Sequence, residues 1–206
     1  MKVQLTLLLI CMLLSEVQSL LCQCVSPVGF VQCRHQKEIN CPDQCASLTF
    51  FVKQDDLNMT TVVKTCGAPE LCSNNSVNMG GVTASRNAYC CNTTFCNSKT
   101  LPVLTQQRAN GKMCYTCIGS DCSQTMDCVG EEYYCISQTV NQLGNTLNLK
   151  GCANKATCGG SGFLISQGIN MVDNQCCKGN LCNAAQSFTL SVILMSIPLV
   201  FSILYS

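Results

Sequence analysis

CCNTTFCN, residues 90–97, and CCKGNLCN, residues 176–183, are two copies of one pattern. In each copy two adjacent cysteines are followed by four other residues, a further cysteine and an asparagine. Lys64-Thr65-Cys66 and Lys150-Gly151-Cys152 repeat in the same way upstream of each copy. A repeat of about 80 residues is too long for a solenoid, so the pattern indicates tandem duplication of a whole domain.

Cysteine dominates the composition, with 21 cysteines among 206 residues. This density is typical of disulfide scaffolds made in an oxidising compartment. Cys11 lies in an N-terminal apolar stretch, and the other cysteines form two groups of ten. The first group is Cys22, Cys24, Cys33, Cys41, Cys45, Cys66, Cys72, Cys90, Cys91 and Cys96, and the second is Cys114, Cys117, Cys122, Cys128, Cys135, Cys152, Cys158, Cys176, Cys177 and Cys182. Their even number indicates that all of them pair.

The two ends of the chain resemble targeting segments. Residues 1–19 have the charged, apolar and small-residue regions of a cleaved signal peptide. The apolar stretch Phe188–Ser206 follows the small residues Asn183–Ala185 and has no Lys or Arg after it, which is typical of a propeptide, here 184–206, that is exchanged for a glycosylphosphatidylinositol (GPI) anchor. We expect Asn183 to be the lipid attachment residue. A single-pass helix and a secreted form are the alternatives.

Between the ends, the pattern predicts β structure. Residues 47–52 and 59–64 are rich in β-branched and aromatic side chains and flank a polar turn, and module two repeats this hairpin signal over 133–150. We expect one domain over 20–97, a linker over 98–111 and a second domain over 112–183. No stretch between 22 and 182 shows sustained helical periodicity.

These features resemble the lymphocyte antigen 6 and urokinase receptor family. The resemblance is carried in module two by the opening Cys114-Tyr-Thr-Cys117, the cysteine order and the closing CCKGNLCN. Module one departs from the family at Cys22-Gln-Cys24, where one residue replaces the usual two, and is similar to the gamma-type phospholipase A2 inhibitors over Asp43–Thr49 and Pro69–Cys72. The resemblance implies a small disulfide-rich all-β fold of two tandem three-finger (snake-toxin-like) domains.

The cysteine spacing alone leaves the connectivity open, because eight cysteines already allow 105 pairings. The resemblance implies pairing of the first cysteine of each module with the fifth, the second with the third, the fourth with the sixth, the seventh with the eighth and the ninth with the tenth. It also implies middle fingers over 46–65 and 136–151, and third fingers over 73–89 and 159–175.

Finger tips are exposed loops on a rigid base, where binding residues tend to lie. The candidates for ligand contact are all in module two: Leu143, Phe163, Leu164, Ile165, Ile169 and Met171. Packing of the small core is the alternative role for each. Sequons predict glycosylation at Asn58, Asn74 and Asn92, all in module one. Because a glycan at Asn58 would hinder a partner on that finger, we expect the ligand to contact module two or the region between modules.

An enzyme is not expected. His35 is the sole histidine, and no motif near it offers a nucleophile with an orienting acid. Cys114-x-x-Cys117 lacks the context of a redox or zinc motif, and a net charge of +1 gives no footprint for nucleic acid. We therefore expect no cofactor and no metal. The predicted function is that of a GPI-anchored cell-surface receptor for an extracellular protein, with a transmembrane co-receptor to carry a signal. A secreted phospholipase A2 inhibitor and a structural adhesion or coat protein are the alternatives.

Overall fold

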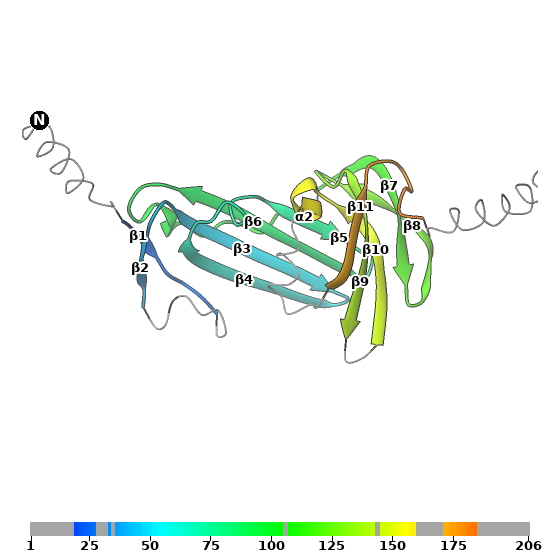
Figure 1. Cartoon of the computed structure of the whole chain (residues 1–206), viewed down its shortest axis with the longest axis horizontal. Helices are drawn as coiled ribbons and strands as arrows, with labels where there is room; N and C mark the ends of the chain where they lie inside the picture. Colours follow the sequence, from blue (N-terminus) through cyan, green and yellow to red (C-terminus); the bar gives the residue numbers. More distant parts are fainter. Residues whose placement is uncertain are drawn as a thin grey trace, which may run out of the picture.

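The computed structural model describes residues 19–27, 33, 36–104, 107–142, 145–159 and 171–184 (Figure 1). These residues form strands joined by short turns, and the prediction of a disulfide-rich all-β fold with two three-finger domains is confirmed. Among them, no helix is long and apolar enough to cross a membrane.

Module one consists of three hairpins and a short 3-10 helix. Its elements are β1 (Leu20–Gln23), β2 (Glu38–Cys41), β3 (Cys45–Gln54), β4 (Leu57–Cys66), β5 (Asn75–Asn78), β6 (Val82–Cys91) and η1 (Cys96–Ser98). The middle finger, β3 and β4, turns at Asp55, whose φ of 51° lies in the left-handed region that Asp tolerates better than most residues. Along its whole length β3 pairs with β4 on one side and β6 on the other.

Module two repeats the arrangement with a longer first finger. Its elements are β7 (Ala109–Ile118), β8 (Asp121–Val129), β9 (Tyr134–Gln142), β10 (Asn145–Ala153), α2 (Lys155–Gly159) and β11 (Met171–Cys177). The central strand β9 pairs with β10 and β11, as β3 does with β4 and β6. The first finger, β7 and β8, forms a separate two-stranded sheet.

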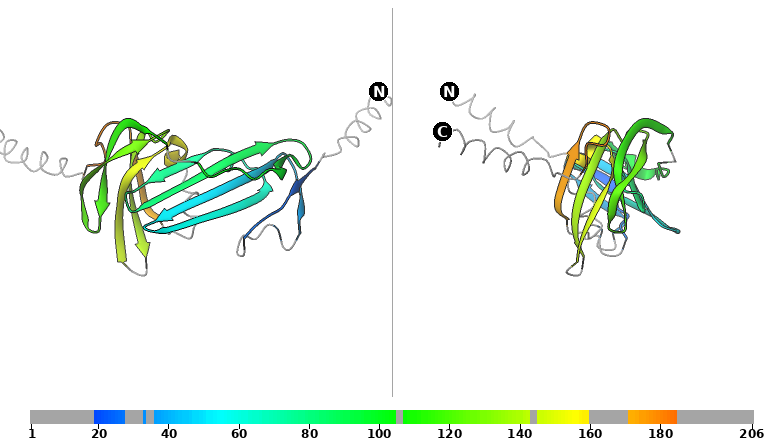
Figure 2. Two further views of the ribbon diagram at one scale, coloured as in Figure 1. Left: turned by 180° about the vertical axis from the view of Figure 1, so that it is seen from behind. Right: turned by 90° about the vertical axis from the view of Figure 1, so that its right-hand side faces the viewer.

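The two modules share one sheet, which the sequence did not predict. β10 of module two pairs with β5 of module one through Cys152↔Asn78 and Ala153↔Val77. The result is a seven-stranded sheet in the order β11-β9-β10-β5-β6-β3-β4 (Figures 1 and 2). Its main apolar core also crosses the junction, because Ile136 and Ala153 of module two pack in the same cluster as Leu48, Phe50 and Val77 of module one.

A glycine allows this close approach. A Cβ atom at Gly151 would lie 1.9 Å from the carbonyl oxygen of Asn78 and 2.7 Å from the Cα of Met79. Both are backbone atoms, so a side chain at this position could be admitted only by moving one strand away from the other.

The segment between the modules is ordered against module one. The hydroxyl groups of Ser47 and Thr49 donate hydrogen bonds to the carbonyl groups of Lys99 and Leu101, each at 2.8 Å. Asn87 donates to the carbonyl of Pro102 at 2.9 Å. Residues 109–111 already belong to β7, so the linker expected over 98–111 is shorter in the structure and its first part is packed on the sheet.

Candidate ligand-binding surfaces

Ten disulfides form the base from which the fingers extend. In module one they are Cys22–Cys45, Cys24–Cys33, Cys41–Cys66, Cys72–Cys90 and Cys91–Cys96. In module two they are Cys114–Cys135, Cys117–Cys122, Cys128–Cys152, Cys158–Cys176 and Cys177–Cys182. These are the same pairs that the family resemblance implies.

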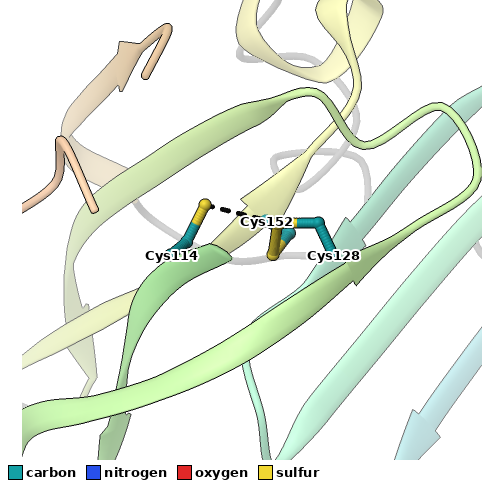
Figure 3. Close-up of side chains that lie close together, drawn as sticks. All are labelled: Cys114, Cys128 and Cys152. Atoms are coloured by element: carbon teal, nitrogen blue, oxygen red, sulfur yellow. Dashed lines mark hydrogen bonds between the residues drawn. A yellow bond between two sulfur atoms is a disulfide. The ribbon is translucent and has the colours of Figure 1, made fainter. Parts of the chain in front are cut away.

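Three buried sulfur atoms of module two lie as close together as metal ligands. They belong to Cys114, Cys128 and Cys152 (Figure 3), and the Sγ atoms of Cys114 and Cys128 are 3.3 Å apart. Cys128 is bonded to Cys152, however, and Cys114 to Cys135. Because metals bind the thiolate form of cysteine, these packed disulfides do not make a metal site. The Cys114-x-x-Cys117 pair is also divided between two bridges, so it is not a dithiol redox motif.

An asparagine closes the base of each module. The Asn97 side chain accepts from the backbone nitrogen of Gln23 at 2.9 Å and donates to the carbonyl groups of Gln23 and Ala46. Asn183, the expected lipid attachment residue, accepts from the nitrogen of Tyr115 at 2.9 Å and donates to the carbonyl groups of Tyr115 and Ile136. Both side chains are buried. Because a lipid is joined through the carboxyl group of the attachment residue, attachment at Asn183 would leave these hydrogen bonds in place.

The ligand contacts predicted from the sequence fall largely outside the described residues. This applies to Leu143, Phe163, Leu164, Ile165 and Ile169. Met171 begins β11 in the third finger of module two. His35 also lies outside the described residues.

The structure instead shows exposed apolar side chains that the sequence pattern did not single out. Leu57 and Met59, on the middle finger of module one, are 63% and 53% exposed. Ile118, at the tip of the first finger of module two, is 69% exposed, and Leu147 on β10 is 41% exposed. Apolar residues beside a turn, such as Leu57 and Met59, can be recognised in the sequence as candidates for ligand contact. They were missed because a glycan at Asn58 was expected to cover this finger.

A glycan at Asn58 would lie on the face of the middle finger opposite to Leu57 and Met59. Asn58 is exposed on β4 between Leu57 and Met59, and successive side chains of a strand point to opposite faces. Asn58 therefore lies on the face that carries Phe51 and Lys53 and lines a cavity with them. A sugar at Asn58 would leave the apolar face of this finger accessible.

This cavity, of about 480 Å³, lies at the junction of the modules. It is bounded by the back of the module-one sheet, by Val103 and Leu104 of the linker, and by Val129, Glu131 and Glu132 of module two. The predicted glycosylation sites Asn58 and Asn74 both line it. Asn92, the third sequon, is exposed in the turn after β6.

Glu132 is a buried carboxyl group at this junction. Its side chain is 2% exposed, and burial raises its pKa to about 7, although hydrogen bonds from Ser76 and from the Val129 nitrogen oppose the shift. Ser76 belongs to β5 of module one. Its carbonyl also accepts from the nitrogen of Asn154 at 3.1 Å and from the hydroxyl of Thr157 at 3.0 Å. The junction is therefore polar as well as apolar.

Comparison with known proteins supports the family resemblance. Residues 18–99 match a family described as u-PAR/Ly-6 domain, and residues 113–183 match one described as snake toxin and toxin-like protein. The urokinase plasminogen activator surface receptor of Bos taurus is 32% identical over 103 residues, which cover 46% of this chain and 31% of the receptor. A phospholipase A2 inhibitor gamma subunit of Elaphe climacophora is 29% identical over 128 residues, which cover 56% of this chain and 64% of the inhibitor. Its counterpart from Elaphe quadrivirgata matches to the same extent. The chain thus spans about a third of the receptor's length and just under two thirds of the inhibitors' length.

Proposed function

Because the chain belongs to the u-PAR/Ly-6 family of three-finger proteins, we propose that it is a non-catalytic receptor, held at the cell surface by a GPI anchor, that binds an extracellular protein. The relatives are named as a surface receptor and as inhibitors of an enzyme. Binding through exposed loops on a cross-linked base is the activity that this architecture favours.

The observation that carries the proposal is the set of exposed apolar side chains on the fingers. Leu57 and Met59 project from one face of a long hairpin, and Ile118 projects from the tip of another. Exposed apolar residues on rigid loops lose little conformational entropy on binding, which favours their use as interface anchors. We propose that the partner contacts these fingers, in addition to the module-two loops named from the sequence.

The partner itself can be sought on cells. Cells that display the chain would be treated with a membrane-impermeant cross-linker, and the captured proteins compared between the wild type and a Leu57→Asp, Met59→Asp, Ile118→Asp variant. A partner that recognises the fingers should be captured at least about tenfold less by the variant, because each charge would have to be desolvated in the interface. A Lys53→Asp variant changes the charge on the opposite face of the finger, where Lys53 pairs with Asn58, keeps the Asn58-Met-Thr sequon and is the control. Equal capture by all three proteins would contradict recognition through these fingers.

The lipid anchor is supported by the apolar segment Phe188–Ser206 and the small residues Asn183–Ala185 before it. It is tested by treating intact cells that express the full chain with a phosphatidylinositol-specific phospholipase C. Release of the chain into the medium is expected. Retention on the cells would contradict the anchor, and appearance in the medium of untreated cells would favour the secreted inhibitor.

A GPI-anchored chain would have no cytoplasmic part, so signalling would need a transmembrane co-receptor. Capture without any signal would instead favour a role in adhesion or as a coat. The cross-linking experiment distinguishes these functions, since a co-receptor would be recovered together with the chain from the same cell.

A further inference from the structure

A second cavity lies wholly within module two and differs from the junction cavity in its charge. It has a volume of about 650 Å³, within the range of sites that hold small organic ligands. Six of the side chains that line it matter for recognition: Lys112, Lys155, Lys178, Tyr133, Tyr134 and Asn154.

Positively charged residues gather around this cavity, although the net charge of the whole chain is only +1. The chain carries 12 Lys and Arg against 11 Asp and Glu, yet three lysines line this cavity together with a single acidic residue, Glu131. The three lysines lie on separate elements: Lys112 on β7, Lys155 at the start of α2 and Lys178 just after β11. They are brought together by the fold of the module and not by a shared strand or helix face.

None of these three ammonium groups has an ion-pair partner among the residues that the structure describes. Unpaired charges of one sign around a concave surface raise the local concentration of oppositely charged ligands. Three lysines and a single glutamate around one concave surface therefore favour an anionic ligand.

The other lining groups indicate the class of anion. Tyr133 is 45% exposed, so it offers a ring face and a hydroxyl group, and Tyr134 adds a second phenol. Asn154 is held in place, because its side chain donates to the carbonyl of Asn74 and accepts from Thr157. Phenol rings with dispersed point charges suit the rings and separated sulfate groups of a polysaccharide.

An acidic peptide fits less well. Clusters of basic side chains can also recognise acidic peptides, but Ala156 is the one aliphatic residue in the lining, so the apolar side chains of a peptide would find little to pack against. A single phosphate would fill only a small part of the volume. We propose that this cavity binds a sulfated polysaccharide through Lys112, Lys155 and Lys178, with Tyr133 packed against a sugar ring. This site is separate from the protein-binding fingers and does not depend on the function proposed for them.

The test uses the mature protein purified from cells that express the full chain, titrated calorimetrically with a heparin hexasaccharide at physiological salt. The Lys112→Gln, Lys155→Gln, Lys178→Gln variant should bind at least about tenfold more weakly, because each exposed charge contact contributes a factor of a few. The matched control removes the same charge from exposed lysines outside the cavity, by Lys37→Gln and Lys53→Gln in module one and Lys99→Gln in the segment between the modules. It should change the affinity less than about twofold.

Two further measurements test the roles of the tyrosine ring and of the sulfate groups. Tyr133→Ala should weaken binding of the hexasaccharide, and its desulfated form should not bind. Failure of the wild type to bind heparin, or equal loss in the two triple variants, would overturn the proposal. Preference for a sulfotyrosine peptide over the hexasaccharide would overturn it in favour of a protein ligand. If the first triple variant has a lowered thermal unfolding midpoint, the single Lys178→Gln variant takes its place, and unchanged binding in that variant would also count against the site.

Discussion

Asn97 and Asn183 occupy equivalent positions in the two modules, and each forms with one backbone residue, Gln23 or Tyr115, the same reciprocal pair of hydrogen bonds. Each also donates to the central strand of its module, at Ala46 or Ile136. The asparagine of the CC-x4-CN pattern thus joins the chain end of a module to its first and middle fingers.

Replacing Asn183 by Asp should destabilise module two. The side chain keeps its shape but loses the amide hydrogens that reach Tyr115 and Ile136, and it places a charge in a buried site. We expect a loss of about 3 kcal/mol in the free energy of unfolding, measured by chemical denaturation. Asn40→Asp, on an exposed position of β2, is the control and should change stability by less than about 0.5 kcal/mol. A similar loss in both variants would show that the hydrogen bonds of Asn183 are not the cause.

A Gly151→Ala variant should loosen the junction between the modules. The added methyl group would overlap the backbone of Asn78 and Met79, so β10 and β5 would have to separate. We expect a loss of about 1 to 3 kcal/mol and faster amide hydrogen exchange at Asn78 and Ala153. Gly81→Ala is the matched control, because nothing lies within 4 Å of a Cβ atom there. Unchanged exchange at the junction would mean that the strands tolerate the methyl group.

The sequence predicted the modules well and their junction not at all. The β-branched and aromatic residues over 47–52 and 59–64, on either side of a polar turn, sufficed to predict the middle finger, and β3 and β4 contain these two runs. The pairing of β10 with β5 joins short segments far apart in the chain, and no local pattern encodes such a contact. One sign was present in the repeat itself, since Gly151 stands where module one has Thr65. A glycine at that point of a strand signals a close approach of another backbone.

The candidate site was less predictable than the fold. Lys112, Lys155 and Lys178 line one cavity because three separate elements meet there. Their spacing in the sequence follows no strand or helix period, so the sequence pattern could not predict that they lie together. The apolar finger positions Leu57 and Met59 were visible as residues, but their exposure depends on what the rest of the sheet covers.

Asn74 should carry a glycan. Its side chain is exposed, its Oδ1 accepts from the nitrogen of Ala88 at 2.9 Å, and its Nδ2 forms no hydrogen bond within the described part of the chain. Peptide N-glycosidase treatment of the protein from mammalian cells, followed by peptide mass spectrometry, should show conversion of Asn74 and Asn58 to Asp. Asn78, which lines the same cavity but is not in a sequon, serves as the internal control. An unconverted Asn74 would contradict the prediction.

Glu132 should make the stability of the chain depend on pH. Burial raises the pKa of its carboxyl group from 4.5 to about 7 in the folded protein. Between these values the folded state holds a proton that the unfolded state has released. The free energy of unfolding that is due to this group is therefore greatest below about pH 4.5, falls as the pH rises through 7 and is then constant.

Substituting Glu132 by Gln removes this dependence while keeping the size of the side chain. The difference in unfolding free energy between Glu132→Gln and the wild type should grow by about 3 kcal/mol between pH 4.5 and pH 8, in favour of the variant at high pH. Urea denaturation at a series of pH values measures it, and Glu131→Gln, at the exposed neighbouring position, is the control. Because Glu132 lies against Ser76 of the other module, hydrogen exchange at β5 and β10 should slow in the Gln variant at pH 8. A pH-independent difference between Glu132→Gln and the wild type would show that the carboxyl group is not buried in solution as it is in this structure.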